Sequence, residues 1–482
     1  MIESSPRQRT LVLAICCMSL LIVSLDNTVL NVALPSMRRD LDASVAGLQW
    51  SIDSYTLVLA SLLMLAGSTA DRIGRRKVFV AGLVLFTLGS LLCSLAPSLD
   101  WLIVFRMVQA VGGAMLNPVA MSIITNTFTE PAARARAIGV WGAVAGVSMA
   151  AGPLIGGVMV DSVGWRSIFW LNLPIGVAAL VLTLRHIPES RAARPRRPDP
   201  VGQVLVMALL GSVTYGIIEA PAVGWGSPLI VGCGVVAVAS LVGLLVYEPR
   251  REEPLVDLRF FRSAPFSGAT VIAVSAFAGL SGFLFLNTLY LQDVRGLGAL
   301  EAGLYMLPMA TLTFLFAPLS GRLVATRGPR LPLLVAGVTM SASGLLFAVF
   351  EAETSTPLLF AGYMLFGLGF GMVNAPVTNT AVSGMPRSQA GVAAAIASTS
   401  RQTGGTLGVA VVGSVLASGM GHGSDFAEAT GPAWWIITAC GLIVLVVGAA
   451  TSGPWARSTA ARTARTLDPA AAPARADAPD RA

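Results

Sequence analysis

The sequence predicts an all-α polytopic membrane protein of about fourteen transmembrane helices, arranged as two six-helix bundles plus two inserted helices. Apolar residues make up 55% of the 482 positions and charged residues only 12%, whereas soluble domains carry charge at about 25% of positions. Stretches of roughly 20 apolar residues, the length that spans a bilayer, recur along the chain. Short charged or Pro/Gly-rich loops separate them, and no stretch between them is long enough for a soluble domain.

Six of these stretches form a first block, which defines an N-terminal domain at residues 1–185. The first apolar run follows Arg7 and Arg9, and it is too long for a signal peptide and lacks a small-residue cleavage site. It is therefore interpreted as a retained helix. The predicted spans of this domain are residues 11–35, 48–68, 78–96, 101–125, 137–160 and 167–185.

Two linkers and two further spans make up a middle region at residues 186–262, and a second six-helix domain follows at 263–453. The inserted spans are predicted at residues 201–219 and 228–247. The last six are predicted at residues 265–291, 302–324, 331–350, 357–383, 391–418 and 433–453. Residues 454–482 are rich in Ala, Pro and Arg, and we expect them to form a disordered cytoplasmic tail.

The distribution of basic residues predicts the orientation, because cytoplasmic loops carry an excess of Arg and Lys. With the N-terminus inside, the only basic residues that fall in outer loops are Arg38, Arg39, Arg166 and Arg295. An even number of spans then places both termini in the cytoplasm, in a multi-pass protein of the cell (inner) membrane. The net charge of +7 is spread over alternate loops and forms no single stripe, so nucleic acid is not an expected partner.

Residues that could support catalysis or hold a metal are scarce. The 5 cysteines lie in apolar stretches at no metal-site spacing, and both histidines, His186 and His422, fall in loops. The only lysine, Lys77, follows Arg76 where a phosphate-binding loop requires glycine. We expect no enzyme activity, no metal site and no cofactor, and energy must then come from a gradient.

The chain also contains an internal repeat. Gly67 and Gly74 have the same separation as Gly321 and Gly328, and basic residues follow both pairs. The repeat relates the second predicted span to the tenth. This offset is what a duplicated six-helix unit with an inserted helix pair produces.

Five segments together resemble the major facilitator superfamily, and within it the fourteen-helix drug:proton antiporter branch, over nearly the whole chain. The segments are LDNTVLNVALP at 25–35, GSTADRIGRRK at 67–77, RMVQ at 106–109, GVSMAAGPLIGG at 146–157 and WRSIFWLNLPIG at 165–176. The resemblance implies a major facilitator fold and proton-coupled efflux of small organic compounds, drugs or antibiotics, by alternating access. Two positions depart from the pattern: Ala110 stands where the family usually has Gly, and Ala325 stands at the second-half equivalent of Asp71.

Asp26 is the strongest candidate for proton coupling. It lies about nine residues from the predicted outer end of its helix, roughly 13 Å below that interface, and an ionisable group at such depth is a functional hypothesis by default. Arg106 is predicted roughly 8 Å below the same interface, closer to the depth of Asp26 than to the cytoplasm. It can pair with Asp26, and the resemblance implies a proton-relay role for it. Asp53 is a further candidate. Three alternatives stay open: hydrogen bonding of Asp26 to Asn27 or Asn31, snorkelling of Arg106, and an interfacial position of Asp53.

Two motifs have a mechanical interpretation. In the loop motif, an acidic and several basic side chains can form an ion pair that opens and closes as the domains rock; the alternative is a pure topology signal. Its candidate switch residues are Gly67, Asp71, Arg72, Gly74, Arg75 and Arg76. In the fifth span, small residues and a proline allow close helix contact, and the resemblance makes them an exporter motif. Its residues are Gly146, Gly152, Pro153, Gly156 and Gly157.

The substrate cavity is expected to be lined by polar and soft side chains of adaptable shape, although each alone is compatible with a packing role. The candidates are Asn31, Tyr55, Asn287, Tyr290, Met306, Met309, Phe370, Asn374 and Arg401. The expected partners are a small organic substrate, protons and the lipid bilayer, and we expect a monomer. Two alternatives to drug efflux are a dedicated exporter of an endogenous metabolite, such as a siderophore or self-made antibiotic, and a non-transporting membrane sensor.

Overall fold

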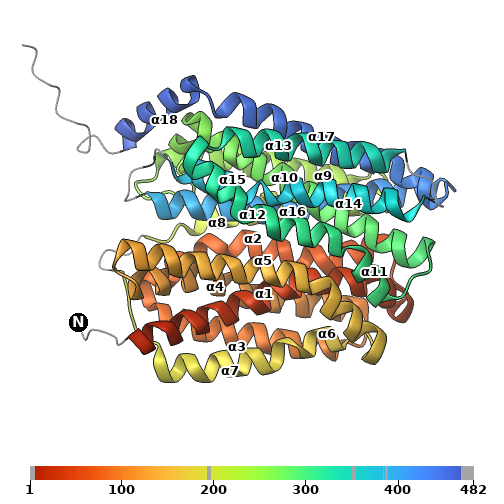
Figure 1. Cartoon of the computed structure of the whole chain (residues 1–482), viewed down its shortest axis with the longest axis horizontal. Coiled ribbons are helices and arrows are strands. Elements are labelled where there is room, and N and C mark those ends of the chain that lie inside the picture. Colours follow the sequence, from red (N-terminus) through yellow and green to blue (C-terminus); the bar gives the residue numbers. More distant parts are fainter. Residues whose placement is uncertain (1–5, 193–196, 350–353, 384, 386–388, 468–482) are drawn as a thin grey trace, which may run out of the picture.

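The computed structural model describes residues 6–192, 197–349, 354–383, 385 and 389–467. Within these ranges every regular element is a helix, and the long helices run along one common axis (Figure 1). Helix α1 (Pro6–Leu41) begins, and helix α18 (Pro454–Leu467) ends, at the same end of the molecule (Figure 1). We call this the terminal end and the other the opposite end.

The first bundle contains α1 and five further spans. These are α2 (Val45–Ile73), α3 (Arg75–Ser94), α4 (Leu99–Thr127), α5 (Pro131–Val163), and the broken span of α6 (Ser167–Trp170) and α7 (Asn172–His186). Local sequence determines where several of them begin and end. Ser44 caps α2 by accepting a hydrogen bond from the Gly47 amide at 3.1 Å. Gly74 and Gly164 end α2 and α5 with φ of 127° and 102°, which glycine adopts without strain.

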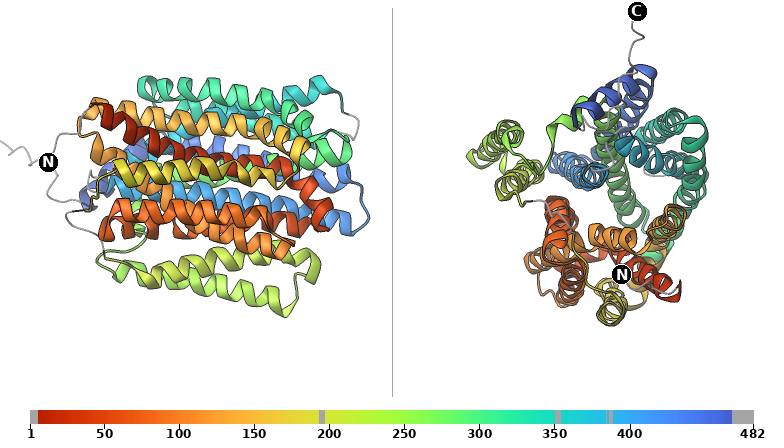
Figure 2. Two further views of the ribbon diagram at one scale, coloured as in Figure 1. Left: turned by 90° about the horizontal axis from the view of Figure 1, so that it is seen from below. Right: turned by 90° about the vertical axis from the view of Figure 1, so that its left-hand side faces the viewer.

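Two inserted helices, α8 (Pro200–Val223) and α9 (Pro228–Tyr247), lie beside the two bundles (Figure 2). Helix α8 packs against α2 and α16, and α9 packs against α8. The Trp50 indole of α2 donates a hydrogen bond to Glu219 of α8 at 2.7 Å. The α9 span has a mean hydropathy of 2.7 and only 17% of it is buried, so most of this helix faces lipid.

The second bundle follows two short 3₁₀ turns, η1 (Glu248–Arg250) and η2 (Leu258–Arg262). Its helices are α10 (Ala264–Leu289) with the π turn η3 (Tyr290–Val294), α11 (Ala299–Tyr305), α12 (Leu307–Arg327), α13 (Arg330–Ala348), α14 (Thr356–Gly371), α15 (Asn374–Val382), α16 (Ala390–Gly421) and α17 (Phe426–Thr451). Aromatic rings fill its core. Phe283 stacks on Phe366 with ring centroids 4.1 Å apart, and Phe347 stacks on Trp434 at 4.6 Å.

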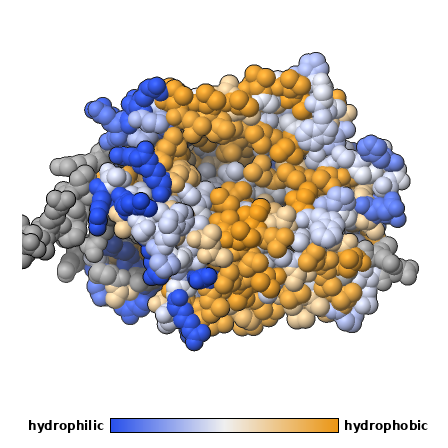
Figure 3. All heavy atoms as spheres, turned by 90° about the horizontal axis from the view of Figure 1, so that it is seen from above, coloured by the Kyte–Doolittle hydropathy of each residue, from blue (hydrophilic) through white to orange (hydrophobic). Residues whose placement is uncertain are grey.

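The predicted fold class is confirmed. In the described residues 13 helices are long and apolar enough to cross a membrane, and the bent helix α5 brings the number to 14. Hydrophilic side chains gather at the two ends of the molecule, with a hydrophobic belt between them (Figure 3). Such a belt is what burial in the hydrocarbon core of a bilayer requires. The chain is a multi-pass membrane protein.

Three predicted spans are broken where continuous helices were expected. They are residues 167–185, 302–324 and 357–383, which break at Leu171, at Met306 and at Met372 with Val373. A proline follows each break and cannot donate to the carbonyl four residues earlier. For Pro376 that carbonyl belongs to Met372, and it accepts a hydrogen bond from the Ser320 hydroxyl at 2.9 Å instead.

The prediction of a disordered tail is wrong for residues 454–467, which form α18. Its small side chains recur on one face, so that Ala456, Ala460 and Thr463 are buried against α10 and η2. The Thr459 hydroxyl accepts a hydrogen bond from the Ala264 amide at 2.9 Å. Composition alone misses this because it ignores helical spacing. The rest of the predicted tail, residues 468–482, lies outside the described residues.

Close packing of α3 on α4 generates a first prediction. A Cβ added at Gly112 would lie 2.3 Å from the Phe86 backbone nitrogen, which no side-chain rotation can relieve. Gly112→Ala should therefore destabilise the protein by about 1–3 kcal/mol, seen as a lower thermal unfolding midpoint in detergent. The matched control is Gly232→Ala in α9, where a Cβ meets no heavy atom within 4 Å. Equal midpoints for the two variants would contradict this account of the packing.

Candidate functional site

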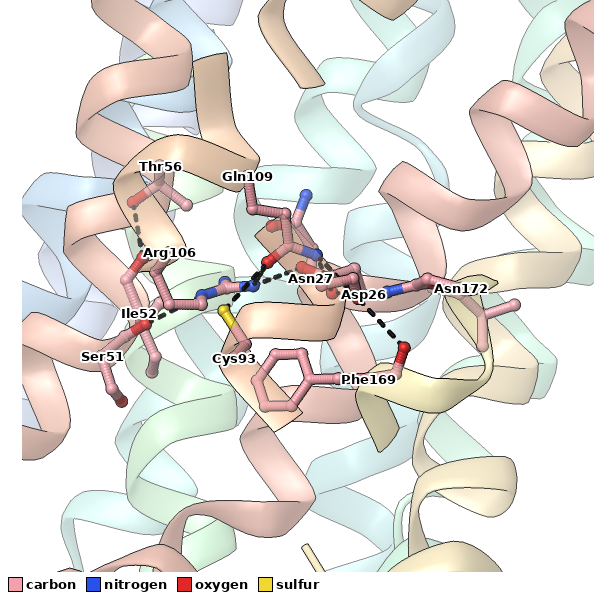
Figure 4. A network of polar contacts seen from close by, with 12 residues as sticks. Asp26, Asn27, Ser51, Ile52, Thr56, Cys93, Arg106, Gln109, Phe169 and Asn172 are labelled. Atoms are coloured by element: carbon pink, nitrogen blue, oxygen red, sulfur yellow. Dashed lines mark hydrogen bonds and ion pairs between the residues drawn. The ribbon is translucent and has the colours of Figure 1, made fainter. Parts of the chain in front are cut away.

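Asp26 lies near the middle of α1 and points into the first bundle (Figure 4). Its residue is only 6% exposed. One carboxylate oxygen accepts hydrogen bonds from the side-chain amides of Gln109 at 2.8 Å and Asn172 at 2.9 Å. The other oxygen pairs with the Arg106 guanidinium. Three donors from α4 and α7 therefore surround one carboxylate.

Arg106 belongs to α4, and its side chain is 1% exposed. Besides Asp26, its guanidinium donates to the Ser51 carbonyl of α2 at 3.2 Å and to the Gln109 side-chain carbonyl at 3.0 Å. It also lies over the Tyr55 ring, 4.3 Å from the centroid. The Arg106 side chain thus contacts α1 and α2 at once. The alternative that Arg106 snorkels to the interface is wrong in this structure.

A further layer of contacts fixes the amides that hold Asp26. Asn172 also donates to the Ser90 hydroxyl at 2.9 Å, and that hydroxyl donates to the Phe169 carbonyl at 3.0 Å, next to the break between α6 and α7. The Cys93 thiol lies 3.8 Å from the carbonyl oxygen of Gln109 (Figure 4). These contacts link α3, α4 and the α6–α7 break to the carboxylate.

Three donors converge on the two oxygens of the Asp26 carboxylate, and the contact with Arg106 is an ion pair between opposite charges. The predicted alternative partners Asn27 and Asn31 are wrong, because the Asp26 carboxylate bonds instead to Gln109, Asn172 and Arg106. The Asp26 carboxylate therefore links α1 to α4 and α7.

Asp53, in α2, is fully buried and lies close to the second bundle. One carboxylate oxygen receives a hydrogen bond from the Thr56 hydroxyl at 3.4 Å. The other has no hydrogen-bond partner among the described residues. The Thr56 hydroxyl in turn meets the Thr406 hydroxyl of α16 at 2.9 Å. The residue therefore lies where the two bundles meet.

Sequence reasoning did not assign a role to Gln109 or Asn172. Both sit inside the segments that carry the family resemblance, at residues 106–109 and 165–176. Their position in these segments is the sequence feature that could have identified them as site residues. Their convergence on Asp26 depends on helix rotation in the bundle, which a linear motif does not show.

The loop motif connects α2 to α3 at the terminal end. Asp71 and Arg75 form an ion pair at 2.9 Å. The loop after α7 docks on the motif, because Glu189 accepts from the Arg76 amide at 3.1 Å and the Arg75 amide donates to Ser190 at 2.9 Å. The expected ion pair exists, but both partners belong to the first bundle, so rocking of the two bundles does not by itself separate them.

Three other residues of this motif are placed as follows. A Cβ on Gly74 would meet the Glu189 carboxylate at 2.6 Å, so that glycine makes room for the docking loop. A Cβ on Gly67 would only touch Pro118 at 3.6 Å. The Arg72 side chain is exposed at the terminal end.

The small residues of α5 bring two different neighbours close. A Cβ at Gly152 would lie 1.9 Å from the Thr28 hydroxyl, and one at Gly156 would lie 3.0 Å from Val29, both in α1. A Cβ at Gly157 would lie 2.5 Å from Leu300 of α11, across the boundary between the bundles. Pro153 lies beyond a bend of 41° in α5, and Gly146 lines a pocket. These glycines therefore let α5 pack both inside its bundle and against the other one.

An apolar pocket lies between the two bundles. Helices α1, α5, α10, α12 and α14 supply its walls. The lining residues are Thr28, Asn31, Val32, Gly146, Met149, Pro153, Leu280, Leu284, Met306, Met309, Ala310, Thr313 and Phe370. Four predicted cavity residues lie there, namely Asn31, Met306, Met309 and Phe370. The pocket encloses about 550 Å³ of space free of protein atoms, open solvent included.

Five predicted cavity residues do not line this pocket. Tyr55 lies under Arg106, and the Asn287 side chain is bonded to Tyr363 at 2.9 Å. Tyr290 stacks on Phe426 with centroids 6.5 Å apart. Asn374 begins α15 beyond the break in its span, and Arg401 contacts Ser398 at 2.9 Å and Thr378 at 3.4 Å. Which side chains reach the pocket depends on the rotation of each helix, which sequence depth alone does not give.

Contacts near the opposite end join the two bundles. The Asp161 carboxylate of α5 accepts hydrogen bonds from the Ala299 and Leu300 amides at 3.0 and 2.8 Å, at the start of α11. Arg38 pairs with Asp293 at 3.3 Å. Nearby, the Gln292 amide donates to the Val32 carbonyl at 2.9 Å. These contacts close the opposite end over the pocket.

Deeper contacts join α2 to α16. The Gln49 amide donates to the Val409 and Ala410 carbonyls at 3.0 and 2.8 Å. Gln49 also fills the space beside Gly413, where a Cβ would lie 2.5 Å from the Gln49 side chain. Gln49 lies in the first two turns of α2, which start from the opposite end.

Curated relatives match most of the chain. It is 38% identical over 415 residues to the multidrug resistance protein Stp of Mycobacterium tuberculosis, covering 86% of this chain and 76% of that protein. It is 38% identical over 402 residues to the tetracenomycin C resistance and export protein of Streptomyces glaucescens, covering 83% and 74%. It is 35% identical over 398 residues to the methylenomycin A resistance protein of Streptomyces coelicolor, covering 82% and 83%.

A structural superposition and a family profile lead to the same assignment as these relatives. A crystal structure of a bacterial homolog of the human lysosomal transporter Spinster, in an inward-facing and occupied conformation, superposes with a TM-score of 0.65 at 20% identity. The match covers 95% of this chain and 98% of that one. The sequence profile of the Major Facilitator Superfamily matches residues 16–409. The chain therefore belongs to the major facilitator superfamily.

Proposed function

We propose that this protein exports small organic compounds, drugs or antibiotics, across the cell membrane in exchange for protons, by alternating access. The single observation that carries the proton part is the buried carboxylate of Asp26, paired with Arg106 in the middle of a transmembrane helix. An ionisable group at this depth marks an ion or proton pathway by default. The apolar pocket between the bundles supports the transport part.

The orientation of the chain supports the direction of transport. The excess of basic residues in the loops at the terminal end supports a cytoplasmic location for that end and for both chain termini. The opposite end is then outside, and the contacts of Asp161 and Arg38 close the pocket on that side. In this arrangement cargo enters from the cytoplasm, and export requires these outer contacts to break.

The coupling follows from the contacts of Asp26. While the carboxylate is ionised, Arg106, Gln109 and Asn172 hold it in the first bundle. A proton that arrives from outside neutralises it and weakens all three interactions, which frees α1 to move against α4 and α7. Return of the protein to the inward-facing state releases the proton inside. We propose that this cycle needs no cofactor, and that the protein works as a monomer.

The names of the relatives support export as the direction of transport and drugs or antibiotics as the cargo. They include a multidrug resistance protein, a tetracenomycin C resistance and export protein, a puromycin resistance protein, and a protein named as a drug efflux pump. Transport of these compounds out of the cell is therefore the first activity to measure. The comparisons do not favour a dedicated exporter of an endogenous metabolite.

Asp26→Asn tests the coupling site. In proteoliposomes, substrate-driven proton movement with a panel that includes puromycin and tetracenomycin C should fall at least about tenfold, because the amide cannot take up a proton. Exchange of labelled for unlabelled substrate, which needs no net proton movement, should persist. The matched control is Asp42→Asn, since Asp42 is exposed beside α1 with φ of 49°, a conformation that Asn tolerates. Unchanged proton movement in Asp26→Asn would reject Asp26 as the coupling site.

Asp53→Asn tests whether a second carboxylate titrates. We propose that Asp53 takes up a proton as the bundles separate, since one of its oxygens is buried without a partner. The variant should carry fewer protons per substrate molecule than the wild type, measured as the reversal potential in proteoliposomes. An unchanged ratio would show that the residue only supports the contact between Thr56 and Thr406.

Asp161→Asn tests the outer closure. The neutral amide should bind the start of α11 less well than the carboxylate, so outward-open molecules should become more frequent. Spin labels at Val163 and Glu301, after replacement of the 5 native cysteines, should then show a longer distance component. Asp40→Asn is the matched control, because Asp40 contacts Trp165 and Arg166 within the first bundle. Identical distance distributions in all three proteins would overturn this role for Asp161.

A further inference from the structure

The pocket between the bundles has no charged side chain among its lining residues. Its walls are formed by aliphatic groups, three methionines and Phe370, with Thr28, Asn31 and Thr313 as the polar side chains. Methionine and phenylalanine favour contact with aromatic rings. Phe370 is held edge-on against Phe277, with centroids 5.2 Å apart, so its ring position is fixed.

The deep carboxylate of α1 faces away from this pocket. Successive residues of an α-helix are rotated by about 100°, which places Thr28 about 200° and Asn31 about 140° from Asp26 around the helix axis. The contacts agree with this rotation. Thr28 lines the pocket, whereas Asp26 points at Arg106 in the interior of the first bundle (Figure 4).

Two other charged residues deep in the described helices, Asp53 and Arg401, do not supply a negative charge to the pocket. The Asp53 carboxylate is buried against Thr56, and Asp53 does not line the pocket. Arg401 contacts Thr378 and Ser398 and carries a positive charge. A cation placed in the pocket would therefore lose its hydration without gaining a carboxylate partner, which costs several kcal/mol for an unpaired buried ion.

The polar side chains of the pocket act mainly as acceptors. The Thr28 hydroxyl donates to the Leu25 carbonyl at 3.1 Å, and the Thr313 hydroxyl donates to the Met309 carbonyl at 2.9 Å. The Asn31 amide nitrogen donates to the Asn27 carbonyl at 3.0 Å, and the Asn31 side-chain oxygen is an acceptor. A ligand would satisfy these oxygens with hydroxyl or N–H groups of its own.

We propose that this pocket selects uncharged aromatic molecules that carry hydroxyl or N–H donors, and that it discriminates against permanent cations. The proposal rests on the proposed function, since it names the cargo class of the same transporter. It also separates the two sites: cargo and proton occupy opposite faces of α1 and do not compete for one carboxylate. Coupling must then run through movement of α1, not through displacement of the proton by the cargo.

The test compares ethidium, a permanent cation, with its uncharged parent amine, the same diaminophenylphenanthridine without the N-ethyl group. Binding to the purified full-length protein in detergent is measured by fluorescence titration at a pH where the parent is neutral. We expect the parent to bind at least about tenfold more tightly than ethidium, because only the cation loses its hydration unpaired. Equal or tighter binding of ethidium, or binding of neither compound, would overturn the proposal.

A pair of variants at Met149 sharpens the test. Met149 lines the pocket and is partly exposed to it. Met149→Glu places a carboxylate there and should invert the preference, with ethidium gaining at least about tenfold. Met149→Gln has nearly the same shape without the charge and should keep the preference of the wild type. If ethidium gains equally in both variants, the preference does not arise from charge.

Failure of this inference can be told from failure of the proposed function. Binding in detergent requires neither a proton gradient nor transport. If the parent amine binds as expected but no compound moves across proteoliposomes, the export proposal fails and the pocket assignment stands. If compounds are exported but ethidium binds as well as its parent, the export proposal stands and the pocket assignment fails.

Discussion

The structure is organised around one constraint, which is the need to stabilise a single negative charge in the middle of a transmembrane helix. Asp26 is 6% exposed, and an unpaired carboxylate at that depth would be costly. Arg106, Gln109 and Asn172 meet this need from two other helices, and Ser51 and Tyr55 hold Arg106 from a third. Much of the helix packing of the first bundle therefore converges on one titratable group.

The second bundle is built differently. Its core is a cluster of aromatic rings around Phe283, and polar side chains bond between helices of the same bundle, as Asn287 of α10 does with Tyr363 of α14. Its helices break beside prolines, which leaves short segments such as α11 at the boundary between the bundles. The start of α11 then offers two free amides to Asp161 of the first bundle. The first bundle thus contains the buried ion pair of Asp26 and Arg106. The second bundle supplies a large part of the pocket and the α11 amides that bond to Asp161.

Helix α5 connects these two features. Its glycines approach Thr28 and Val29 of α1 on one side and Leu300 of α11 on the other. Met149 and Pro153 of the same helix line the pocket. Any shift of α1 would therefore be transmitted through α5 to both the pocket and the outer closure. This gives a physical reason for small residues along α5, because larger side chains would separate it from both neighbours.

The sequence by itself determined the helical class, the number of spans and the pairing candidates Asp26 and Arg106, because hydropathy, loop charge and depth along a helix are properties of the linear chain. It also placed Asn31, Met306, Met309 and Phe370 at the right depth for the pocket. It did not show that Gln109 and Asn172 complete the Asp26 site, or that α18 is a helix packed on α10. Those outcomes depend on how each helix is rotated about its axis and which neighbour it meets, and only tertiary packing fixes that rotation.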